Sequence, residues 1–95
     1  MKESVKDFNR DMLYTAVLGL KSREECAAFF SDLCTDVEIA AISQRLAVAV
    51  MIEEGKKYDE IEQLTGASPA TISRVKRSMK NYREFGILDR IRGDV

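Results

Sequence analysis

Small, hydroxyl-bearing and basic side chains gather in one stretch of the sequence, between residues 68 and 80. They are Ser68, Ala70, Thr71, Ser73, Arg74, Lys76, Arg77 and Lys80. A threonine can donate to a phosphate or touch a thymine methyl, and an arginine can bond guanine or phosphate. Lysine and arginine also bind phosphates regardless of base sequence. The order of residue types, small first and basic after, suits a segment that approaches duplex DNA closely.

The charge of the chain is unevenly distributed, although its formal net value is only −1. Residues 1–67 hold 8 Lys and Arg against 13 Asp and Glu, whereas residues 68–95 hold 7 against 3. Binding to phosphates needs a basic face rather than a basic protein. The positive excess begins where the polar stretch begins. Lys57, just upstream, is a further candidate for a phosphate contact, with ordinary solubility as the alternative.

Two short helices joined by a three-residue turn are expected to present this stretch. The first covers residues 58–65, and Gly66 permits the positive φ that a tight turn requires. Ser68 can cap the second helix, with Pro69 at its first position, where a missing N–H costs nothing. The pattern over residues 58–80 is that of a helix-turn-helix. A plain helical hairpin with a solvated polar face has the same spacing and is the alternative.

The rest of the chain is also expected to be helical, because apolar residues recur at spacings of three and four and Pro69 is the one proline. Ser22 and Glu25 form a capping box, and Thr35 is a further N-cap candidate. The expected ranges are residues 4–19, 22–33, 35–54 and 81–92. The sequence therefore predicts one all-α domain over residues 1–95.

The third of these helices carries an unbroken apolar run from residue 46 to residue 52. A helix that is apolar on every side must be surrounded by protein. In a chain of 95 residues few elements remain to surround it. The run therefore predicts a homodimer in which a second copy covers this helix. The alternative is that it forms the interior of the chain's own core.

The residue types argue against catalysis and against a metal site. The chain has no histidine, no glycine-rich phosphate loop and no nucleophile elbow. Cys26 and Cys34 lie over two turns apart on one expected helix, too far for a disulfide, and zinc would lack further ligands. No apolar run is long enough to cross a bilayer, and no signal region precedes the first helix. We therefore expect a cytoplasmic, non-enzymatic protein with reduced cysteines, without a metal, a cofactor or a membrane partner.

The segment Leu64–Arg74, with the sequence LTGASPATISR, resembles the helix-turn-helix of the tryptophan repressor family. Within that family it is similar to the uncharacterised proteins of the YerC/YecD type. The likeness extends upstream through Thr35, Arg45 and Gly55 and weakens before residue 20. It implies an intertwined all-helical dimer that binds operator DNA, with the recognition positions at residues 67–74.

The same resemblance implies a site for a small-molecule effector. Thr35, Arg45, Arg74 and Ser78 match positions around the tryptophan corepressor, whose carboxylate the two arginines hold, a contact that suits the guanidinium fork. Val75 stands where the repressor has a glycine, and its branched side chain crowds the space of an indole ring. A different small acid, or no effector, is therefore expected. For Arg45, an ordinary solvated or salt-bridged residue is the alternative.

Together these inferences predict a sequence-specific transcriptional regulator, a repressor by resemblance, that binds double-stranded DNA. The residues expected to contact bases or adjacent phosphates are Ala70, Thr71, Ser73 and Arg74. Those expected to anchor the DNA backbone are Lys76, Arg77 and Lys80. The alternative function is a dimeric helical protein-interaction module whose helix-turn-helix packs on another protein. Salt dependence separates the two, since contacts to phosphates weaken steeply as salt rises.

Overall fold

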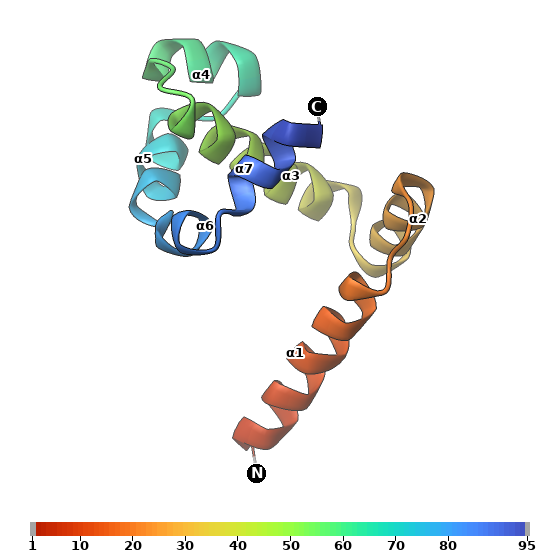
Figure 1. Ribbon diagram of the computed structural model, residues 1–95. Helices are drawn as coiled ribbons and strands as arrows, with labels where there is room; N and C mark the ends of the chain where they lie inside the picture. Colours follow the sequence, from red (N-terminus) through yellow and green to blue (C-terminus); the bar gives the residue numbers. More distant parts are fainter. Residues whose placement is uncertain (1, 95) are drawn as a thin grey trace. The chain divides into compact units, whose positions relative to one another are not determined.

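The computed structural model describes the backbone of residues 2–94 and the side chains of residues 4–91, and this part of the chain is helical, without a strand (Figure 1). The helices are α1 (Lys2–Leu18), α2 (Arg23–Leu33), α3 (Asp36–Glu53), α4 (Tyr58–Thr65), α5 (Pro69–Arg77), α6 (Lys80–Phe85) and α7 (Ile87–Asp94). The predicted all-α class is confirmed. None of the described helices is long and apolar enough to cross a membrane. The chain divides into two compact units, Met1–Asp36 and Val37–Val95.

The first unit contains α1 and α2. Ser22 caps α2 as predicted, because its Oγ accepts the N–H of Glu25 at 3.0 Å. The Glu25 carboxylate in turn accepts the N–H of Lys21, the residue before the cap, at 3.2 Å, a variation on the capping box. Cys26 and Cys34 are both half-buried and form no disulfide. Among the described residues, no group of three His, Cys, Asp or Glu side chains could hold a metal ion.

The second unit has its core around the C-terminal half of α3. Val48 and Ala49 are fully buried there, and Val50, Met51 and Ile52 pack against the same cluster. The other members come from α4 to α7 and the segments that join them: Ile61, Ala67, Ile72, Val75, Met79 and Leu88. Of the apolar run of α3, however, only Val48 and Ala49 are buried; Leu46 is 38% exposed and the other four residues are half-buried. The chain's own helices therefore cover this run in part, and the predicted homodimer stays a prediction.

Two helix boundaries differ from the prediction. The recognition segment was expected to stay helical to Lys80, but α5 ends at Arg77, where the N–H of Ser78 bonds to the carbonyl of Val75 at 2.9 Å. Met79, just beyond this end, lies in the core at 1% exposure. The single helix expected over residues 81–92 is divided into α6 and α7 by Gly86, whose φ of 63° ends α6 in the left-handed region.

Candidate nucleic-acid interface

The turn between α4 and α5 is held by its own hydrogen bonds. Gly66 has a φ of 75°, and its N–H bonds to the carbonyl of Glu62 at 2.8 Å, so it ends α4 as predicted. The Thr65 hydroxyl donates to the carbonyl of Ile61 at 2.7 Å and accepts the N–H of Ala67 at 3.1 Å. Ala67 is buried in the core. The turn is therefore held both by this buried side chain and by the hydrogen bonds of Gly66 and Thr65.

Ser68 and Thr71 form the start of α5. The Ser68 Oγ accepts the N–H of Thr71 at 3.2 Å and donates its proton to the Thr71 Oγ1 at 3.1 Å. Pro69 occupies the first turn, as predicted. Because the Thr71 hydroxyl accepts from Ser68, its own proton remains available for an outside acceptor. The two hydroxyls thus have different roles: Ser68 stabilises the helix end, and Thr71 can donate outward.

The two faces of α5 differ sharply in chemistry. Ile72 and Val75 point into the core and are buried. The predicted DNA-contact residues Ser68, Ala70, Arg74, Lys76 and Arg77 are exposed, while Thr71 and Ser73 are half-buried at the edge of this face. The last turn of α5 is basic, and its first turn contains no acidic residue. The structure therefore brings these seven sequence candidates together on one helix.

The remaining basic candidates flank α5. Lys57 precedes α4 as its N-cap residue, and Lys80 begins α6; both are exposed. The Lys76 ammonium lies 5.7 Å from the ring centroid of Tyr58, the first residue of α4, in a cation–π arrangement. This contact brings the basic end of α5 to the start of α4, directly after Lys57.

Gln44 of α3 also contacts the turn between α4 and α5. No motif in the sequence around Gln44 predicts this contact. Its side-chain nitrogen, Nε2, donates to the backbone carbonyl of Thr65 at 3.1 Å. A Cβ added to Gly66 would lie 3.8 Å from the same nitrogen. The two partners are 21 residues apart. Local periodicity presents Gln44 only as one polar residue of an amphipathic helix.

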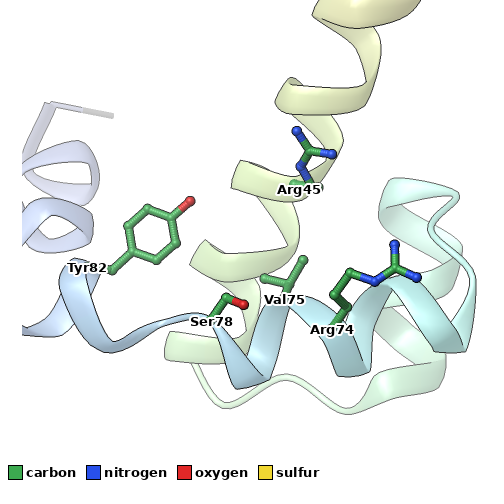
Figure 2. Close-up of a pocket in the computed structure, with 5 residues that line it drawn as sticks. All are labelled: Arg45, Arg74, Val75, Ser78 and Tyr82. Carbon is green, nitrogen blue, oxygen red and sulfur yellow. The ribbon is translucent and has the colours of Figure 1, made fainter. Parts of the chain in front are cut away.

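A pocket of about 310 Å³ lies beside α5, lined by Arg45, Arg74, Val75, Ser78 and Tyr82. Figure 2 shows the Tyr82 ring and Arg74 on opposite sides of Val75, with the Tyr82 hydroxyl directed toward the helix that carries Arg45. Arg45, Arg74 and Ser78 are three of the four predicted effector residues, and the structure brings them together. Thr35, the fourth, belongs to the first unit.

Tyr82 was not among the predicted residues, and no motif in the sequence marks it. It is half-buried, packs against the core and also lines a second, smaller cavity of about 70 Å³. Val75 is 6% exposed and belongs to the core, so its side chain cannot leave the pocket without opening a void behind it. Both side chains therefore border the space beside the arginines.

The pocket is electrostatically positive. Within the described part of the chain, neither Arg45 nor Arg74 forms a salt bridge, whereas Arg83 is paired with Glu53 at 3.3 Å. Both guanidinium groups are exposed, so water satisfies them in the absence of another partner. Two arginines and a serine hydroxyl around one cavity form a donor set that matches a carboxylate or another small oxyanion.

Comparison with known proteins gives consistent matches. The family model for the Trp repressor protein matches residues 9–85. The uncharacterised protein YerC of Bacillus subtilis (strain 168) is 57% identical over 72 residues, which is 76% of this chain and 68% of that protein. A crystal structure provisionally described as a Trp repressor from Staphylococcus aureus is 52% identical, with a TM-score of 0.84 over 95% of this chain and 92% of that chain. A TrpR-like protein from Eubacterium eligens is 42% identical, with a TM-score of 0.72 over 80% and 87%.

Proposed function

The chain belongs to the Trp repressor family, and on that premise we propose that it is a sequence-specific, DNA-binding transcriptional regulator, acting as a repressor. The observation that carries the proposal is the division of α5 into a buried apolar face and an exposed face of hydroxyl and basic groups. A helix of this kind, capped by Ser68 and preceded by a rigid turn, is suited to the major groove. In this role the protein acts by binding in the cytoplasm, not by catalysis.

The residues of α5 divide by their position along the helix. Small side chains at its start, Ser68 and Ala70, let the helix approach the base edges closely. Thr71, Ser73 and Arg74 follow and contact bases or adjacent phosphates. The basic residues anchor the DNA backbone through charge. Lys76 and Arg77 lie at the end of α5, and Lys80 and Lys57 lie on the segments that flank it.

The working form in this proposal is a homodimer. The apolar run of α3 is only partly covered by the second unit, and further apolar side chains are uncovered within each unit. On α1, Phe8 is 63% and Leu18 is 86% exposed, and on the first half of α3, Val37 is 78% exposed. Uncovered apolar surface of this extent is typical of a face that packs on a partner. A two-fold symmetric dimer would present two copies of α5 to half-sites about one helical turn of DNA apart.

A small acid other than tryptophan is the effector that the pocket fits best. Arg45 and Arg74 supply the charge for a carboxylate, and Ser78 supplies a hydroxyl. Val75 and Tyr82 border this pocket, and the branched Val75 in place of the repressor's glycine argues against an indole ring there. Because Arg74 also belongs to the exposed face of α5, a bound acid would act directly on a DNA-contact residue. Regulation without any effector is the remaining possibility within this proposal.

Selection of random duplex DNA by the purified protein tests the central proposal. The expected result is enrichment of a two-fold symmetric site, and Arg74→Ala should abolish it. Arg23→Ala, which removes the same charge from α2, is the matched control and should leave the enrichment intact. Failure of the unmodified protein to enrich any sequence, with and without pooled small acids, would refute DNA recognition and favour a protein-interaction module.

A further inference from the structure

We propose that Gln44 is a positioning residue for the recognition helix: it holds the C-terminal end of α4 on α3 and thereby sets where α5 begins. This inference rests on the proposed DNA-binding function. Its basis is the hydrogen bond from the Gln44 Nε2 to the carbonyl oxygen of Thr65, at 3.1 Å. Gln44 would not touch DNA itself in this role.

The carbonyl of Thr65 is one that α4 cannot satisfy by itself. The last four carbonyls of an α-helix have no partner within the helix, and they need a cap, water or another group. Gly66 satisfies the carbonyl of Glu62 with its own N–H. The carbonyl of Thr65, the last residue of α4, receives its donor from α3 instead. A side chain from another helix thus serves as part of the C-cap of α4.

A continuous series of short contacts leads from this bond to α5. Thr65 accepts the N–H of Ala67 through its hydroxyl at 3.1 Å. Ser68 follows Ala67 directly and caps α5 through the N–H of Thr71 at 3.2 Å. Only Gly66 and Ala67 separate Thr65 from the Ser68 cap, so a shift of the Thr65 carbonyl is passed on to the first residues of α5.

Apolar packing alone does not fix this position as sharply. Ile61, Ala67 and Ile72 are buried in the core of the unit. Apolar contacts are non-directional, so they favour burial without aligning particular polar groups. A hydrogen bond is directional and fails outside a narrow range of distance and angle. The Gln44 hydrogen bond therefore sets the position of the end of α4 on α3, whereas the apolar core only holds the helices together.

The Gln44→Met variant tests this role, because methionine keeps the length and packing of the side chain but lacks the donor. Gln44→Glu is a second variant, in which an ionised carboxylate, an acceptor only, faces the Thr65 carbonyl. Gln63→Met is the matched control, since Gln63 lies exposed on α4 itself. Amide hydrogen exchange of Gly66 and Ala67 measures the turn without any DNA. The effect on DNA binding is measured by the affinity for the selected site, the affinity for random duplex DNA and the salt dependence of binding.

The expected result is faster exchange at Gly66 and Ala67, on the order of tenfold as for the loss of one hydrogen bond, with core amides unchanged. Affinity for the selected site should fall by a similar factor, while binding to random DNA and its salt slope stay constant. Gln63→Met should change neither. Unchanged exchange, equally faster exchange in the core, or unchanged affinity despite a loosened turn would each overturn the proposal. If the unmodified protein selects no DNA, the proposed function fails, and the exchange comparison still decides whether Gln44 fixes the turn.

Discussion

The hydroxyls of Ser68 and Thr71 lie 3.1 Å apart, and Ser68 donates to Thr71. The same Ser68 oxygen accepts the backbone N–H of Thr71 at 3.2 Å. One serine therefore both caps α5 and leaves the proton of the neighbouring threonine available to an outside acceptor. This pair of residues thus contributes both to helix stability and to the proposed DNA contact. Substitution of Ser68 can change one of these two properties more than the other.

Replacement of Ser68 should affect folding and DNA binding differently according to the new side chain. Ser68→Ala removes the cap and should lower the free energy of unfolding by about 1 kcal/mol. Ser68→Asp keeps a capping oxygen and adds a negative charge that the helix N-terminus favours, so stability should be retained. The same charge repels phosphates, so DNA affinity should fall far more in Ser68→Asp than in Ser68→Ala. Urea unfolding and DNA titration of both variants check this, and equal DNA affinity in the two would contradict it.

Salt titration should separate residues that contact phosphates from residues that read bases. Lys76→Ala and Lys80→Ala should each weaken binding to all duplexes and reduce the salt slope by about 1. Arg74→Ala should instead relax sequence preference at one position, with a cost of about 1–3 kcal/mol. The measurement is the dissociation constant on selected and random duplexes over a range of salt. If Arg74→Ala weakened binding equally on selected and random duplexes, Arg74 would be a phosphate contact rather than a base contact.

Shortening Val75 should make room in the pocket beside Arg45 and Arg74. Val75 is almost fully buried, so Val75→Ala should cost about 1–3 kcal/mol of stability through the lost packing. Calorimetry with tryptophan should show no binding to the unmodified protein and measurable binding to Val75→Ala. The test uses temperatures at which both proteins are folded. Tight binding of tryptophan by the unmodified protein would refute the steric role of Val75 and Tyr82.

A charge on the apolar side of α1 should disrupt the proposed dimer. Phe8 is 63% exposed, and a buried, unpaired carboxylate at this position would be costly in an interface. Phe8→Glu should therefore shift the protein toward the monomer at micromolar concentration, as measured by light scattering or sedimentation. Asn9→Glu adds the same charge one residue along the helix and is the control, because Asn9 is polar and exposed. A monomeric unmodified protein would remove the dimer from the proposal.

The sequence alone determined the elements whose cause is local. Ser22 with Glu25, and Ser68 with Thr71, cap helices through residues three apart, and Gly66 takes the left-handed conformation that ends α4. Such features depend on neighbours in the chain, so their residue types and spacing are enough to predict them. The polar and basic face of α5 follows from the same short-range periodicity. The Leu64–Arg74 string likewise identified the family before any fold was known.

Only the tertiary structure decided which distant residues meet. The sequence presented the whole apolar run of α3 as a surface for a second copy, and the tertiary structure shows that the chain's own core buries Val48 and Ala49 of it. The apolar spacing of Ile72, Val75 and Met79 continues past Arg77, so the sequence does not reveal that α5 ends there. Gln44 meets Thr65 across 21 residues, and Tyr82 enters the pocket from a different helix. These relationships arise when helices pack, because packing joins residues by position in space rather than by spacing along the chain.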